Sequence, residues 1–159
     1  MTDVKDLSKT KLKELIKIIP YQWRVQSFSK TKPMAQCVAY IDSRDVMKLL
    51  DEVICVENWQ SDYKEVKGNV YAGIGIKIGS EWVWKWDCGI ESNMDKEKGE
   101  ASDSFKRAAV KWGVGRFLYD LDIKFVKANE AKTSTNFPYV INDNGNRIFD
   151  LTKYINTLN

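Results

Sequence analysis

The segment from Glu100 to Leu121 combines an apolar stripe with a basic one. On a helix, the apolar positions share one side that is about as wide as a core-facing surface: Ala101, Phe105, Ala108, Ala109 and Trp112. Lys106, Arg107 and Lys111 fall outside this stripe, and no acidic residue occurs between Ser104 and Tyr119. A basic face of a single sign favours an anionic partner such as a phosphate backbone, and the alternative is a solvated face without a ligand.

A second basic element lies nearer the N-terminus. Lys30 and Lys32 belong to a polar loop, and Arg24 precedes this loop while Arg44 follows it. These side chains could contact phosphate groups as well, although a solvated basic loop explains them equally.

Three residues near the end of an expected strand could instead support metal-dependent chemistry. Asp62, Glu65 and Lys67 contain a Glu-x-Lys element, which a nuclease can use to hold a divalent ion and orient water. The element runs directly into the turn at Gly68 and Asn69, where solubility also explains the charges. A metal-dependent nuclease is therefore the alternative function.

Other catalytic devices are missing from the sequence. The chain has no histidine, which excludes Ser-His and Cys-His nucleophilic pairs and histidine-ligated zinc. Cys37, Cys55 and Cys88 lack the spacing of a metal site, and no GxxxxGK[ST] phosphate loop occurs. We therefore expect a protein that is not an enzyme, that binds no metal or other cofactor and that does not hydrolyse ATP.

The composition bounds the architecture and the location. The chain has 159 residues and a net charge of +3, so we expect one domain over 1–159 with a local basic patch. No apolar run approaches 18 residues, and the N-terminus lacks the apolar core of a signal peptide. We expect a cytoplasmic protein that does not contact membranes.

The elements that must position these residues can be read from hydrophobic periodicity. The pattern predicts a helix over 4–19 that ends before Pro20, and extended pieces over Tyr21–Phe28 and Gln36–Tyr40. Asp42 is a typical N-cap for a helix over Ser43–Ile54. Its expected buried stripe contains Val46, Leu49, Leu50 and Val53.

The period then changes to two, which predicts three strands over 59–66, 70–78 and 82–88. Short turns join them into an antiparallel meander. The chain after Leu121 is expected to be weakly structured until a C-terminal hairpin and short helix over 137–158. The predicted fold class is therefore α+β.

Two further features leave alternatives open. Trp82, Trp84 and Trp86 share one face of their strand, which could stack bases, pack under the basic helix or contact a neighbouring subunit. Gly113 interrupts the basic helix, and Arg116 would lie on the apolar side if that helix stayed straight. We therefore expect a structural or intersubunit salt bridge for Arg116.

The segment SDSFKRAAVKWG, residues 102–113, resembles the signature helix of the Rad-fifty-two/Rad-twenty-two single-strand annealing family, including its phage members of the Sak type. Upstream, Tyr40-Ile41-Asp42, Asn58-Trp59 and the run 68–74 are similar to that family in the same order. The resemblance covers residues 38–121 and implies a β-β-β-α core that assembles into a homo-oligomeric ring. It also implies that single-stranded DNA lies in a basic groove around the ring.

By this resemblance Lys106 and Arg107 correspond to the basic pair that lines the groove. A further family arginine falls on Val110, which leaves Lys111 as its substitute. The arginine of the earlier helix falls on Asp45, which leaves Arg44. The expected DNA-binding residues are thus Lys106, Arg107, Lys111, Arg44, Lys30 and Lys32.

These observations predict an ATP-independent protein that binds and anneals single-stranded DNA in recombination and double-strand break repair. A phage-encoded recombinase acting in the host cytoplasm fits this prediction, with replication or recombination proteins of host or phage as further candidate partners. The alternatives are the nuclease built on Asp62, Glu65 and Lys67 and a non-catalytic RNA-binding or scaffold protein.

Overall fold

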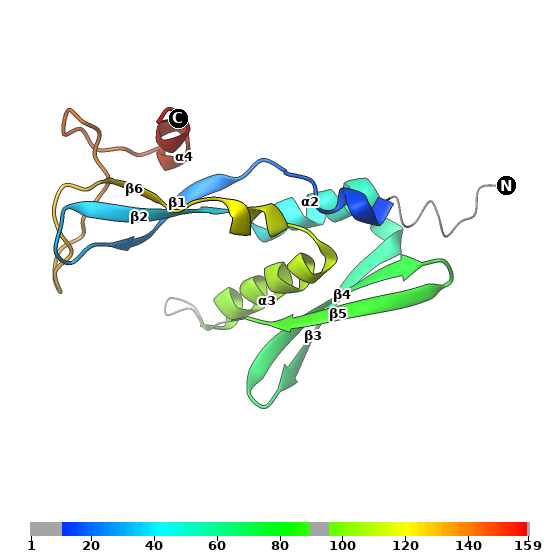
Figure 1. Cartoon of the computed structure of the whole chain (residues 1–159). Helices are drawn as coiled ribbons and strands as arrows, with labels where there is room; N and C mark the ends of the chain where they lie inside the picture. Colours follow the sequence, from blue (N-terminus) through cyan, green and yellow to red (C-terminus); the bar gives the residue numbers. More distant parts are fainter. Residues whose placement is uncertain (1–10, 90–95, 159) are drawn as a thin grey trace. The chain divides into compact units, whose positions relative to one another are not determined.

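The computed structural model describes residues 11–89 and 96–158, which form two compact units (Figure 1). Unit 1 contains the described residues up to Ile19 together with Ile41–Phe117. Unit 2 contains Pro20–Tyr40 and the described residues from Leu118 onward. The single annealing domain expected over 1–159 stays a prediction. Of the helix expected over 4–19, residues 11–14 are helical, and 4–10 lie outside the described residues.

Helix α2 (Ser43–Ile54) has the predicted bounds, and its start is fixed by a capping box. The Asp42 carboxylate accepts a hydrogen bond from the Asp45 backbone N–H, and the Asp45 carboxylate accepts one from the Asp42 backbone N–H. The predicted stripe is buried, with Ile54 added to Val46, Leu49, Leu50 and Val53. A short 3₁₀ turn, η1 (Val56–Asn58), then leads into the first strand of the sheet.

The sheet of unit 1 is an antiparallel meander in the order β3-β4-β5, as the period-two pattern predicts. Its strands are β3 (Trp59–Val66), β4 (Asn69–Ile78) and β5 (Glu81–Cys88). Helix α3 (Lys96–Trp112) lies across one face of this sheet (Figure 1). Ala72, Ile74 and Ile76 of β4 are almost completely buried on that side. This arrangement is the β-β-β-α core.

Unit 2 holds a second antiparallel sheet in the order β1-β2-β6. The strands are β1 (Gln22–Phe28), β2 (Met34–Tyr40) and β6 (Lys124–Lys127), and the short helix is α4 (Leu151–Asn156). The core of this unit consists of Trp23, Ala35, Cys37, Val126, Val140 and Ile155. Burial in this core raises the pKa of the Cys37 thiol to about 11.

The fold is α+β, as expected, but two sequence expectations are wrong in detail. The basic helix ends at Trp112 rather than continuing to Leu121, because Gly113 has a φ of 107° and a 3₁₀ helix, η2 (Arg116–Asp120), follows. The segment after Leu121 supplies strand β6, which pairs with β2. The C-terminal hairpin and the short helix are both present: Ile141 forms an antiparallel bridge with Arg147, and the Ile148 N–H donates to the Val140 carbonyl.

Candidate nucleic-acid interface

The apolar side of α3 is held on the sheet by burial and by one indole hydrogen bond. Phe105, Ala108, Ala109 and Trp112 are buried, as the helical spacing predicts. The Trp112 indole N–H donates to the Ile74 carbonyl at 2.9 Å. This bond satisfies the polar edge of a large buried ring and fixes the C-terminal end of α3 over the middle of β4.

A buried hydroxyl fixes α3 farther toward its N-terminus. Ser104 is fully buried, and its Oγ accepts a hydrogen bond from the Gly89 N–H at 2.8 Å and donates one to the Val70 carbonyl at 2.9 Å. A buried hydroxyl with both functions satisfied has one favourable position. Ser104 and Trp112 together therefore set the rotation of α3 about its axis, which decides which side chains face outward.

The outward side of α3 carries the basic pair. Lys106 and Arg107 are half-buried rather than fully extended into solvent. The Arg107 Nε lies 3.0 Å from the Asp103 Oδ2, one helical turn earlier. The acid-free run that starts at Ser104 therefore has an acidic residue directly before it. Because both side chains are more than a third exposed, this pair adds little stability, and a phosphate group can compete with Asp103 for Arg107.

Three cations gather at the C-terminal end of α3. Arg116 donates from Nε to the Val110 carbonyl at 2.9 Å and from Nη2 to the Lys111 carbonyl at 3.0 Å. The Lys85 ammonium donates to the same Lys111 carbonyl at 3.2 Å, and the Lys111 ammonium donates to the Trp86 carbonyl. Cations at this end complete the last carbonyl groups of a helix and oppose its dipole.

These contacts correct one expectation and qualify another. Arg116 has a structural role, but through carbonyl groups of α3 and not on the apolar side of a longer helix. Lys111 is exposed, as the DNA-binding prediction requires, yet its ammonium also ties α3 to strand β5. Lys85 was not among the predicted residues. The alternation of lysine with tryptophan along its strand was the signal that a cation lies on the helix side of the sheet.

The remaining predicted residues divide between the two units. Arg44 is exposed in the first turn of α2, and the neighbouring Ser43 Oγ lies 2.9 Å from the Ser102 Oγ of α3. The structure therefore brings Arg44 to the same unit and near the same helix as Lys106 and Arg107. Lys30 and Lys32 are exposed in the turn between β1 and β2, in unit 2.

Residues 4–137 match the Rad52/22 family of double-strand break repair proteins. The chain belongs to this family. Its relatives include the single-stranded DNA-binding protein DdrA of Deinococcus deserti, 34% identical over 112 residues, and that of Deinococcus radiodurans, 31% identical over 112 residues. The aligned part is 69% of this chain and 55% and 53% of the two relatives, so the chain spans about half the length of the relatives it matches.

The Rad52/22 match includes every predicted DNA-binding residue, from Lys30 to Lys111. The structure gives a reason for one departure from the family pattern. Asp45, which stands where the resemblance expects an arginine, is committed to the capping box of α2. Membership of the phage Sak type stays a prediction.

The three tryptophans of β5 lie on the face of the sheet opposite α3 in this Rad52/22 family member. Lys85 is paired with Ile74 and reaches the C-terminal end of α3, so its face is the helix side. Side chains alternate along a strand, which places Trp84 and Trp86 on the other face. Packing of these rings under the basic helix, one of the three alternatives, is therefore wrong.

The carboxylates of the nuclease alternative do not converge. Asp62 is paired with Gly73 and Glu65 with Val70. Asp62 and Glu65 are three positions apart in β3, so their side chains point to opposite faces of the sheet. Lys67 lies in the following turn. Among the described residues, no group of three or more cysteine or acidic side chains is placed to hold a metal ion. The geometry gives the nuclease alternative no site.

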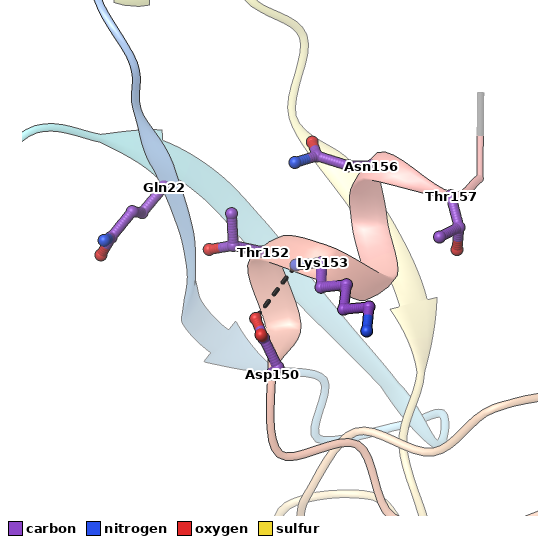
Figure 2. Close-up of a pocket in the computed structure, with 6 residues that line it drawn as sticks. All are labelled: Gln22, Asp150, Thr152, Lys153, Asn156 and Thr157. Atoms are coloured by element: carbon purple, nitrogen blue, oxygen red, sulfur yellow. Dashed lines mark hydrogen bonds between the residues drawn. The ribbon is translucent and has the colours of Figure 1, made fainter.

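A polar hollow beside α4 in unit 2 is a different kind of surface (Figure 2). It is lined by Gln22, Asp150, Thr152, Lys153, Asn156 and Thr157. Asp150 is used structurally, because its carboxylate accepts a hydrogen bond from the Lys153 N–H at the start of the helix (Figure 2). Except for Gln22, this lining lies beyond the Rad52/22 match, and it contains none of the predicted DNA-binding residues.

Among the described residues, no helix is long and apolar enough to cross a membrane.

Proposed function

We propose that this chain binds single-stranded DNA and anneals complementary strands in recombination and double-strand break repair, without ATP. The observation that carries the proposal is the basic outward side of α3, which Ser104 and Trp112 hold in a fixed rotation on the sheet. Membership of the Rad52/22 family and the similarity to the DdrA proteins, which are named as single-stranded DNA-binding proteins, support the same ligand.

The proposed mechanism needs no covalent step. Lys106, Arg107 and Arg44 neutralise phosphate groups and release counterions, which lowers the repulsion between two complementary strands. Arg107 exchanges Asp103 for a phosphate oxygen, so binding is an exchange of ion pairs rather than the pairing of a bare charge. In this proposal the protein is not an enzyme, acts in the cytoplasm and works with other recombination or replication proteins.

Annealing of complementary oligonucleotides should proceed at full rate in EDTA and without a nucleotide. Positively charged side chains supply the proposed neutralisation, so neither a divalent ion nor a phosphate donor enters the reaction. Annealing can be followed by fluorescence transfer between labelled strands, with a protein-free reaction and a heat-denatured sample as controls. Strict dependence on ATP would contradict the proposal, and magnesium-dependent cleavage that Glu65→Ala abolishes would restore the nuclease alternative.

We further propose that the chain assembles into closed homo-oligomers. In the sheet of unit 1, β3 and β5 each have a neighbour on one side only among the described strands. Open strand edges in native proteins are covered, blunted or paired with another chain. A head-to-tail interface whose rotation closes makes a ring, in which the basic pair of α3 would recur once per subunit.

Light scattering at micromolar concentration should therefore report particles of several subunits, each with the 18.4 kDa mass of the chain. The assembly should persist when Lys106 and Arg107 are replaced by alanine, because their proposed ligand is DNA rather than a neighbouring subunit. If the wild-type protein were a monomer at this concentration and still annealed DNA efficiently, the ring would be contradicted and the annealing proposal would stand.

A further inference from the structure

Two indole rings on the face of the unit 1 sheet opposite α3 lie flat on a floor of glycine. Trp86 is paired with Gly73 and Trp84 with Gly75 across β4 and β5. A methyl group at Gly73 would lie 2.6 Å from the Trp86 ring, and one at Gly75 would lie 2.7 Å from the Trp84 ring. Each ring therefore rests against backbone that only glycine leaves open.

The two rings form one surface. Their centroids are 5.5 Å apart, and their planes differ by 21°. The next tryptophan along the same face is Trp82, and 39% of its surface is exposed to solvent. Flat and nearly parallel aromatic rings at neighbouring positions are the geometry on which successive nucleobases stack in proteins that hold single strands.

The charges on this face complement a phosphate backbone. The Lys64 ammonium lies 4.0 Å from the centroid of the Trp86 ring, and Lys77 is paired with Trp82. Asp62 is the acidic residue that the strand register places on this side, and its carboxylate accepts a hydrogen bond from the Tyr63 N–H. One cation therefore lies over the outer face of the Trp86 ring, and the other lies beside Trp82. A base that stacks on Trp86 has to displace the Lys64 ammonium, which is then placed to pair with a phosphate of the same strand.

We propose that Trp84 and Trp86 form a stacking surface for the bases of single-stranded DNA, with Lys64 and Lys77 pairing with the flanking phosphates. This inference rests on the proposed function and adds a second contact surface to it. It differs from the basic side of α3, which faces away from this side of the sheet and would hold the strand by phosphate groups alone.

A second copy of the chain is a less suitable occupant of this face. A protein interface would remove water from the Lys64 and Lys77 ammonium groups, and among the described residues of this face only the Asp62 carboxylate could compensate the two charges. Charged residues are depleted from the centres of protein interfaces. A nucleic-acid strand instead offers a phosphate to each cation and a base to each ring. The charge pattern thus favours the strand.

The test compares binding of the full chain to two strands of equal length and charge, one with bases and one made of abasic sites. Stacking of a single base on an aromatic side chain is worth roughly five- to hundredfold in affinity. We expect the wild type to bind the abasic strand at least tenfold more weakly. Trp84→Leu with Trp86→Leu should bind both strands alike, at the affinity of the wild type for the abasic strand.

Trp82→Leu is the matched control, because it removes an indole from the same strand and face but not from the pair over the glycines. It should keep most of the base preference. Equal binding of both strands by the wild type would overturn the stacking surface while leaving single-strand binding intact. Failure to bind either strand would instead reject the proposed function.

Two further measurements decide the remaining cases. Where the double leucine variant keeps its base preference but changes its particle mass in light scattering, the face is a subunit interface and the inference is wrong. Where that variant does not fold, photocrosslinking of the wild type to strands containing iodouracil decides. Crosslinks on Trp84 or Trp86 support the inference, and crosslinks confined to other residues overturn it.

Discussion

Replacing Lys106 and Arg107 together by alanine should weaken binding of single-stranded DNA of any sequence by about thirtyfold at low salt, taking ~1 kcal/mol for each lost phosphate contact. Each cation contributes about 0.7 to the slope of log affinity against log salt for single strands, so the slope should flatten by about 1.4. The ratio of the wild-type affinity to the variant affinity should then fall about sevenfold between 50 and 200 mM salt. Fluorescence anisotropy titrations over this range measure both quantities.

The control variant removes the same charge elsewhere in unit 1. Lys13 and Lys48 are exposed and lie outside α3, so Lys13→Ala with Lys48→Ala should leave the affinity and the slope close to the wild type. Asp103→Asn should act in the opposite direction, because it frees Arg107 from its ion pair and should tighten binding. An unchanged slope in a folded variant lacking Lys106 and Arg107 would remove α3 from the interface.

The sequence predicts the elements of unit 1 well because their signals are local. The bounds of α2 follow from an N-cap at Asp42 and an apolar stripe at helical spacing, and both are present in the structure. The three strands follow from alternation and from short turns, and the observed bounds differ from the predicted ones by a residue at most. Local capping and periodicity are sufficient for such elements.

The errors arise where long-range contacts decide. Strand β6 has four residues, of which Val126 is buried and Phe125 is exposed, and it exists because it pairs with β2 about ninety residues earlier. No local pattern that short identifies a strand. A tertiary contact also lies at the end of α3. A methyl group at Gly113 would lie 2.5 Å from Ile16, which belongs to a segment far away in sequence.

The candidate site was predictable in composition but not in contacts. The helix spacing identified Lys106, Arg107 and Lys111 as outward-facing, whereas the pairing of Arg107 with Asp103 depends on rotamers. Alternation placed the tryptophans of β5 on one face but could not say which face α3 covers. The available signal was the pattern of Gly73 and Gly75 in β4, since glycines opposite tryptophans leave room for rings on that side.

Gly73→Ala should lower the free energy of unfolding by roughly 2 kcal/mol. Replacement of a strand glycine by alanine usually raises this free energy, because it lowers the entropy of the unfolded chain. The added methyl group would lie 2.6 Å from the Trp86 ring, and the ring has to lift from the sheet to admit it. Lifting the ring also disturbs the Trp84 ring beside it and the Lys64 ammonium above it. Urea unfolding followed by far-UV circular dichroism, at one fixed protein concentration, measures the loss.

A double-mutant cycle separates this clash from a general intolerance of alanine at Gly73. In a Trp86→Ala background the ring is gone, so Gly73→Ala should be neutral or should stabilise by roughly 0.5 kcal/mol through the lower entropy of the unfolded chain. A parallel cycle with Gly75 and Trp84 should give the same sign, because those residues repeat the arrangement one pair along the strands. An equal loss in both backgrounds would mean that the indole does not rest on the glycine, and the flat aromatic surface would then lose its structural basis.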